Sequence, residues 1–296
     1  MTNFAAIFLG IFIEAVPFLL LGTLASGLVE VYLDQEKLVR WLPRQPLLAA
    51  VIGVGLGLVF PVCECGTVPL VRRLLSKGVP PALGMAFLLA APVINPVVIL
   101  STLTAFGPGV VFWGRLGLTA VIALLVGGVL GADPDVHMVL RADAGLTLHC
   151  VQADGQLLPG QRFRQVLLVA ADEFFEMGRY LVIGAALAAL MQLFLPQSWF
   201  LAVQSGPVLS SLFLAALAVL LSICSTVDSF VALGFAGWMP VGAVLAFLVY
   251  GPMVDIKSVL MFGRVFRKRV VVYLVVLPLV LTLLLTGLIN VFWKGG

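Results

Sequence analysis

The stretch Phe60-Pro61-Val62-Cys63-Glu64-Cys65-Gly66 places two cysteines, an acid and two helix-breaking residues directly after a long apolar run. A related block, Ile223-Cys224-Ser225-Thr226-Val227-Asp228, occurs in the second half of the chain. A further interruption follows each block, Ala91-Pro92-Val93-Ile94-Asn95-Pro96 in the first half and Gly251-Pro252-Met253-Val254-Asp255-Ile256-Lys257 in the second. Paired interruptions in two halves of a membrane chain are typical of a solute-binding site at the middle of the bilayer.

The composition is that of an integral membrane protein. Hydrophobic residues make up 62% of the chain, charged residues only 10%, and the mean hydropathy is +1.18, whereas a soluble domain carries about 25% charged residues. The apolar runs are continuous rather than alternating, which predicts membrane-spanning helices and an all-α fold. The net charge of +3 is too small to indicate nucleic-acid binding, and nothing in the sequence indicates a cofactor.

Eight apolar runs and one polar stretch divide the chain. The runs cover about 4–29, 47–62, 82–104, 110–130, 166–194, 207–224, 241–262 and 270–292. The polar stretch holds two short alternating segments, which predict a small β-hairpin. We therefore expect a first membrane repeat at 1–131, a cytoplasmic linker with this β-hairpin at 132–164, and a second membrane repeat at 165–296.

The two halves are related by a nearly constant offset, which indicates a tandem duplication. Glu14 matches Glu176 at 162 positions, Cys63 matches Cys224 at 161, and Asn95 matches Asp255 at 160. Glu14 and Glu176 lie early in the first helix of each half, and we expect them to bond a neighbouring hairpin.

The distribution of Lys and Arg favours inverted repeats, because basic residues concentrate in cytoplasmic loops. If all eight runs crossed the membrane, the basic residues of loops and ends would divide seven to seven. If 47–78 and 207–238 are re-entrant hairpins instead, thirteen lie on one side and only Lys294 on the other. Each half then has three crossing helices plus one hairpin, and both termini lie outside.

The hairpin tips are then expected to meet the interrupted helices near the middle of the membrane. Irregular backbone at that depth is tolerated where protein or a water-filled cavity covers it. The residues expected to break helices there are Pro61, Gly66, Pro92, Pro96, Gly251 and Pro252.

The combined motifs resemble the predicted permeases related to ArsP and YraQ. They are Cys-x-Cys-Gly-x-x-Pro from Cys63, Ala-Pro-x-x-Asn-Pro from Ala91, Cys-Ser-x-x-Asp-Ser-Phe from Cys224 and Gly-Pro-x-x-Asp-Ile-Lys from Gly251. The resemblance implies a multi-pass protein of the bacterial inner membrane, and ArsP-type members export trivalent organoarsenicals. Many relatives have Ser between the first two cysteines, where this chain has Glu64.

The candidate substrate-binding residues follow from their chemistry. Thiolates are soft ligands, and three of them could embrace a trivalent arsenical or another thiophilic solute, although cysteine also packs well as a small residue. Carboxylates at membrane depth cost about 2.5–3.5 kcal/mol each and usually mark a pathway or a proton relay. The predicted binding residues are Cys63, Glu64, Cys65, Asn95, Cys224, Asp228 and Asp255, with Glu64, Asp228 and Asp255 as proton-coupling groups.

Two alternative interpretations remain open at this point. Asp255 could instead be a structural partner of a cation such as Lys257, and Asn95 could simply bond the ends of the broken helix.

The leading hypothesis is a permease, not an enzyme, that exports a soft thiophilic solute by alternating access with proton coupling and confers arsenic resistance. The alternatives are a permease for another small solute or metal complex, and a membrane thiol-redox protein. His137, His149 and Cys150 in the linker match no standard zinc spacing, and we expect no metal site there.

Overall fold

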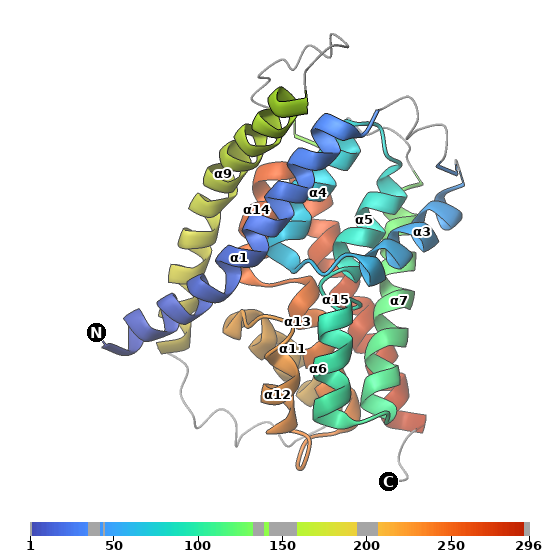
Figure 1. Cartoon of the computed structure of the whole chain (residues 1–296). Helices are drawn as coiled ribbons and strands as arrows, with labels where there is room; N and C mark the ends of the chain where they lie inside the picture. The colour runs from blue at the N-terminus through green and yellow to red at the C-terminus, as the bar shows by residue number, and fades with distance from the viewer. Residues whose placement is uncertain are drawn as a thin grey trace.

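The regular structure of the chain is helical in the computed structural model, which describes residues 2–34, 42–43, 45–132, 139–141, 159–193 and 207–292 (Figure 1). The first half contributes α1 (Thr2–Tyr32), α3 (Pro46–Val59), α4 (Glu64–Ser76), α5 (Pro81–Ala90), α6 (Pro96–Phe106) and α7 (Val110–Leu130). The second half contributes α9 (Pro159–Leu193), α11 (Pro207–Leu221), α12 (Asp228–Leu233), α13 (Val241–Met253), α14 (Ile256–Val265) and α15 (Lys268–Phe292). Among the described residues, each half has a long helix followed by four short helices and a second long helix.

The prediction of a multi-pass helical membrane protein is confirmed. In the described ranges five stretches are long and apolar enough to cross a membrane, namely Phe4–Tyr32, Val110–Leu130, Gln161–Leu193, Val241–Val265 and Lys268–Val291. The apolar run at 82–104, expected as a crossing with an interruption at Pro92–Pro96, forms α5 and α6 on either side of that interruption. The runs at 47–62 and 207–224 form α3 and α11, which are too short to span a bilayer.

The linker between the two halves is described only at its edges. The expected β-hairpin falls on 133–138 and 142–158, outside the described residues, together with His137, His149 and Cys150. Val139–Arg141 lies along the end of α14, where the Arg141 N–H donates to the Val265 carbonyl (3.0 Å) and the Arg267 N–H to the Val139 carbonyl (3.1 Å). Helix α9 already begins at Pro159, inside the stretch expected as linker, and proline suits the first position of a helix.

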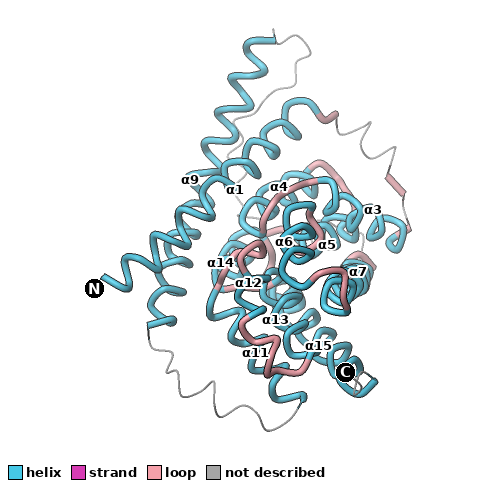
Figure 2. Tube along the Cα trace, turned by 60° about the horizontal axis from the view of Figure 1, so that its bottom comes forward, coloured by secondary structure: helices cyan, strands magenta, loops and turns pink. Residues whose placement is uncertain are grey.

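The helices are arranged as a central pair surrounded by longer helices. Every residue of α5 and nearly every residue of α13 is buried. The long helices α1 and α9 lie side by side and run in opposite directions along one side of the molecule (Figures 1 and 2). The contacts between the halves are crossed. Helix α4 packs on α14, which corresponds to α6, and α12, which corresponds to α4, packs on α6.

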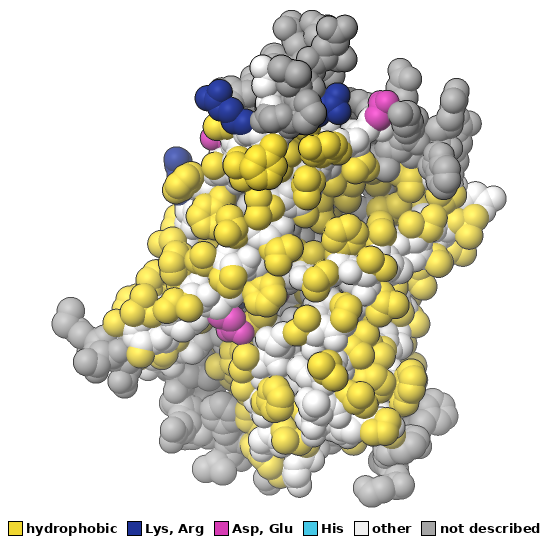
Figure 3. Space-filling model, in the orientation of Figure 1, with side chains coloured by type: hydrophobic (Ala, Val, Ile, Leu, Met, Phe, Trp, Pro, Cys, Tyr) yellow, Lys and Arg dark blue, Asp and Glu magenta, His cyan; other side chains and the backbone are white. Residues whose placement is uncertain are grey.

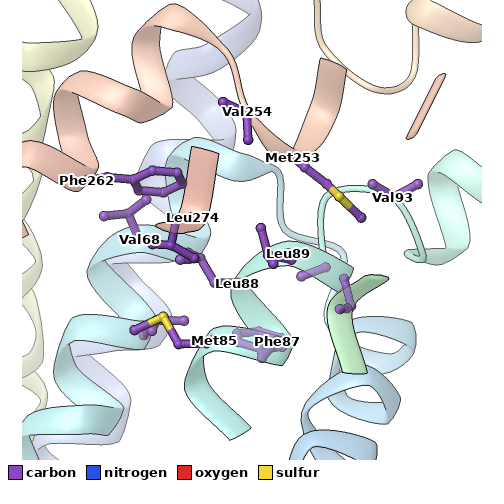
Figure 4. Close-up of a cluster of buried hydrophobic side chains, with 14 of the residues drawn as sticks. Val68, Met85, Phe87, Leu88, Leu89, Val93, Met253, Val254, Phe262 and Leu274 are labelled. Atoms are coloured by element: carbon purple, nitrogen blue, oxygen red, sulfur yellow. The ribbon is translucent and has the colours of Figure 1, made fainter. Parts of the chain in front are cut away.

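The main hydrophobic core lies where the two interrupted helices approach each other. Met253 and Val254, at the end of α13, belong to the same buried cluster as Val93, which follows α5. Figure 4 shows Met253 beside Val93 and Phe262 of α14 beside Val68 of α4. The core is therefore shared by the two halves, and it holds both interruptions in place.

One face of the molecule is largely apolar, with basic residues at one end. On the face shown in Figure 3, Lys and Arg side chains lie at the top and hydrophobic side chains cover the middle. Arg72 of α4 and Arg264 of α14 both bind the Glu176 carboxylate, at 2.8 and 3.1 Å. Two basic segments distant in sequence therefore meet at the same end of the molecule.

Candidate functional site

A polar side chain marks the start of four short helices in the interior. Glu64 is the first residue of α4 and Asp228 the first of α12, while Asn95 and Asp255 are the N-caps of α6 and α14. All four side chains are buried. A helix N-terminus has unpaired N–H groups and a partial positive charge that stabilises an anion by about 0.3–1 kcal/mol, and by up to about 2 kcal/mol in partly buried sites. The helix starts therefore offset part of the cost of burying three carboxylates.

The two N-caps are satisfied locally in different ways. The Asn95 side chain accepts from the Val98 N–H (2.9 Å) and donates to the Ala91 carbonyl (3.1 Å), so its amide bonds both ends of the interrupted helix. Asp255 forms a capping box, accepting from the Ser258 N–H (2.7 Å), while its own N–H donates to the Ser258 hydroxyl (2.9 Å). These contacts fix the starts of α6 and α14.

Lys257 connects three parts of the chain in the interior. Its ammonium group lies 3.2 Å from Asp255 Oδ2 and 3.5 Å from Glu64 Oε1, and it donates to the Ser222 carbonyl at 2.9 Å. Lys257, Glu64 and Asp255 are all at most 4% exposed. Among the described residues, Glu64 Oε2 has no hydrogen-bond partner. We call Glu64, Asp255 and Lys257 the Lys257 cluster, and with all three ionised its net charge is −1.

Three thiols lie near this cluster, within the same buried core. Cys63, Cys65 and Cys224 are buried and free. Cys63 is the extended N-cap of α4, and its thiol lies within hydrogen-bonding distance of the Cys65 thiol. Cys224 lies in the turn before α12, and its thiol donates to the Glu14 carboxylate. In the described part of the chain, no group of three or more Cys, His, Asp or Glu side chains is arranged to hold a metal ion.

Asp228 belongs to a second, separate group of buried charges. Arg115 of α7 binds it with both terminal nitrogens, at 3.1 Å from Oδ1 and 2.8 Å from Oδ2. Arg115 also donates to Thr102 (2.9 Å) and Ser229 (2.8 Å). Arg115 and Asp228, which we call the Arg115 pair, carry no net charge and join α12 to α6 and α7.

The residues expected to break helices lie close to the actual helix ends in the first half. Pro61 lies in the extended segment between α3 and α4, and Gly66 lies within the first turn of α4. Gly66 directly contacts Gly22 of α1, so the two helices approach closely there. Pro92 lies between α5 and α6, and Pro96 is the first residue of α6.

In the second half the interruption falls later than expected. Gly251 and Pro252 lie inside α13, which continues to Met253, and the chain becomes extended at Val254. Proline is tolerated here because it occupies the last turn, and the helix end is closed by the Val254 N–H donating to Tyr250 (3.0 Å). The expectation that Gly251 and Pro252 form the break is therefore wrong by a few residues, and Asp255 lies at the actual break.

Two contributions to the interior were missed in the sequence. Arg115 is an isolated cation within an apolar run, which is itself a signal of a buried partner, but spacing cannot say which acid it meets. Ser222 contributes a backbone carbonyl to Lys257, and a carbonyl leaves no signature in the side-chain pattern. Of the predicted residues, the fold brings Glu64 and Asp255 together through Lys257 and keeps Asp228 apart with Arg115.

A third set of charged residues forms ion pairs at the basic end of the molecule. Glu176 is shared by Arg72 and Arg264, as described above. Arg73 binds Glu173 of α9 (Nε to Oε1, 3.1 Å) and lies 3.4 Å from Glu30 of α1. These pairs tie α4 to both long helices. Glu176 is therefore a structural residue that bonds α9 to α4 and α14.

Comparison with known proteins gives a consistent result over nearly the whole chain. A family model, ArsP_1, described as "Predicted permease", matches residues 1–291. The chain is 42% identical over 288 residues to the UPF0718 protein YcgR of Bacillus subtilis (strain 168), covering 95% of this chain and 96% of that protein. It is 37% identical over 271 residues to a putative two-component membrane permease complex subunit of Streptococcus mutans serotype c, covering 91% and 89%. No solved structure matches the chain.

Proposed function

Because the chain belongs to the ArsP_1 family of predicted permeases, we propose that it exports a small thiophilic solute, such as a trivalent arsenical, across the bacterial inner membrane. The solute binds near Cys63, Cys65 and Cys224, and the Lys257 cluster couples its movement to protons. The protein acts as a transporter rather than as an enzyme.

The observation that carries this proposal is the charge of the Lys257 cluster. Two buried carboxylates share one ammonium group, and Glu64 Oε2 has no hydrogen-bond partner among the described residues. An uncompensated buried charge is costly, so the cluster favours the uptake of one proton or one cation. A site that can hold or release one positive charge is what proton-coupled transport requires.

The thiols favour a soft solute. They lie in the same core as the Lys257 cluster, at two hairpin tips that come from different halves of the chain. Soft metal and metalloid centres bind sulfur in preference to oxygen. A solute held between the tips would contact both halves, so a movement of one half against the other would change its exposure from one side to the other.

The positions of the charges support an inverted relation of the two halves. Arg72 and Arg264 bind the same carboxylate. They would lie on opposite sides if every apolar run crossed the membrane. With the two short hairpins re-entrant, both arginines fall on the cytoplasmic side and both termini lie outside.

The test is uptake of methylarsenite by everted membrane vesicles carrying the protein. Cys63→Ser, Cys65→Ser and Cys224→Ser should each lower the apparent affinity about tenfold, the effect of losing about 1.4 kcal/mol of binding. Cys150→Ser, in the polar linker, is the control and should transport normally. Glu64→Gln should abolish the response to an imposed pH gradient. Normal transport by all three single variants would refute the thiolate site.

The neighbouring thiols of Cys63 and Cys65 favour a membrane thiol-redox protein as the second candidate. This function predicts a reversible disulfide between the two residues, which mass spectrometry of alkylated peptides detects. A permease for another solute predicts instead that the cysteine variants lose transport of that solute while no disulfide forms. A growth screen against arsenicals and other soft metals would identify such a solute.

A further inference from the structure

Glu14 of α1 differs sharply from Glu176, the residue that matches it in the second half. Glu176 binds two arginines. Among the described residues, Glu14 has no cation within ion-pair distance, and its carboxylate accepts a hydrogen bond from the buried Cys224 thiol. The structural explanation that holds for Glu176, pairing with arginine, therefore does not hold for Glu14.

Glu14 also lies at the rim of the buried interior rather than within it. Its side chain is half-buried, and its neighbour on α1, Ile13, is 67% exposed on the outer, apolar face of the helix. A carboxylate in such a place costs about 2.5–3.5 kcal/mol, which protonation removes.

Glu14 lies near the Lys257 cluster. Cys224 lies beside Glu14, and both residues are close enough to Lys257 to interact with it electrostatically. Lys257 in turn pairs with Glu64 and Asp255. Glu14 is thus the partly exposed member of a group of neighbouring titratable residues, and the Lys257 cluster is the buried part of that group.

We propose that Glu14 is the proton-loading carboxyl group of this protein. Through it the Lys257 cluster exchanges protons with the surroundings of α1, at the rim of the buried interior. The inference rests on the proposed function, because it assigns the entry point for the coupled proton. A proton leaves the Glu14 carboxyl and is taken up by Glu64 or Asp255. The Glu14 carboxylate that remains is stabilised by the Cys224 S–H group.

The charged groups around Glu14 are consistent with this role. Lys257 of α14 attracts it, Cys224 of the second hairpin tip donates to it, and Glu64 of α4 lies beyond Lys257. On α9, the acids nearer the basic end are already held, Glu173 by Arg73 and Glu176 by Arg72.

The test is labelling with N,N′-dicyclohexylcarbodiimide, an apolar reagent that adds to protonated carboxyl groups within membranes. The purified wild-type protein in detergent is treated across a range of pH, digested and analysed by mass spectrometry. We expect one adduct at Glu14, greater at low pH, and none at Glu176, which is ion-paired. Glu14→Gln should remove the adduct. An unlabelled Glu14 at every pH would overturn the proposal.

A second measurement links labelling to coupling. Glu14→Gln vesicles should lose the stimulation of transport by a pH gradient, and Glu14→Asp should restore it at least in part. A Glu14→Gln protein that keeps full stimulation would overturn the proposal even if Glu14 is labelled. Labelling needs no solute, so failure of the cysteine variants to affect methylarsenite transport would count against the proposed substrate and not against Glu14.

Discussion

At the scale of single residues, the interior separates two kinds of buried charge. The Arg115 pair is neutral, and both Asp228 oxygens accept hydrogen bonds from the terminal nitrogens of the arginine. The Lys257 cluster has one more acid than base. A neutral ion pair can hold helices together, whereas a cluster with one acid in excess can bind and release a proton. We therefore assign the coupling role to Glu64 and Asp255 ahead of Asp228.

Substitution of the Arg115 pair distinguishes these roles. Arg115→Met leaves Asp228 buried without its partner and should lower the free energy of unfolding by about 3–5 kcal/mol. The double variant Arg115→Met/Asp228→Asn removes both charges and should recover most of that loss, as measured by thermal unfolding in detergent. Exposed Lys268→Met is the control and should leave stability unchanged. A double variant that is stable but inactive in transport would instead give Asp228 a coupling role.

The residues of the site were predictable in type but not in pairing. Acids and cysteines stand out against an apolar background, so Cys63, Glu64 and Asp255 are evident from composition alone. The meeting of Glu64 with Lys257 depends on α4 packing against α14, and this contact joins residues from different halves. Sequence periodicity describes each helix separately, and it contains no information about that packing.

At the scale of helices, glycine allows the long helices to contact the site elements directly. A side chain at Gly22 of α1 would overlap the backbone of Gly66 in α4. At the matching position of α9, the Cβ of a residue replacing Gly184 would lie 2.8 Å from Lys257 Cα. Small residues allow such close approaches between membrane helices. Each long helix thus positions one element of the site.

The matched variants Gly22→Ala and Gly10→Ala test this account within a single helix. The added methyl group at Gly22 displaces α4 and should cost about 1–3 kcal/mol of stability. Gly10 has nothing within 4 Å of the added Cβ, so the same change there should be neutral or stabilise the helix by up to about 1 kcal/mol. Thermal unfolding of the two purified variants provides the comparison. Equal stability would show that the α1–α4 contact is not tight.

The position of the second interruption illustrates a limit of helix-breaking signals. Asn95 and Asp255 were correctly expected near the breaks because capping residues favour helix starts. Pro252 was misleading, because a proline in the last helical turn removes a hydrogen bond that the neighbouring residues can replace. Only the backbone of Val254 shows where the helix ends.

At the scale of the whole molecule, the eight predicted apolar runs identify the apolar helices well. They do not show which of the short runs cross the bilayer. Helix lengths are set by local apolar sequence, so the long crossings were evident. Whether a short run crosses or turns back depends on its tertiary neighbours. The crossed contacts of α4 with α14 and of α12 with α6 fit the inverted arrangement that we propose.

Cysteine labelling tests the inverted arrangement directly. Thr104→Cys at the end of α6 and Lys268→Cys at the start of α15 are both exposed. With a membrane-impermeant maleimide, we expect labelling of Thr104→Cys in intact cells and of Lys268→Cys only in everted vesicles. Both substitutions are made in a Cys150→Ser chain, whose remaining cysteines are all buried, and this chain serves as the background control. Labelling of both variants from the same side would eliminate the inverted arrangement.

Lys257 makes the two halves of the chain chemically unequal. Its matching position in the first half is Val97, which is 45% exposed and carries no charge. A protein assembled from two copies of the first half would present Glu64 twice and no lysine to either copy. Such a protein would lack the ammonium group at its centre, so the site depends on a difference between the two halves and could not be formed by two identical ones.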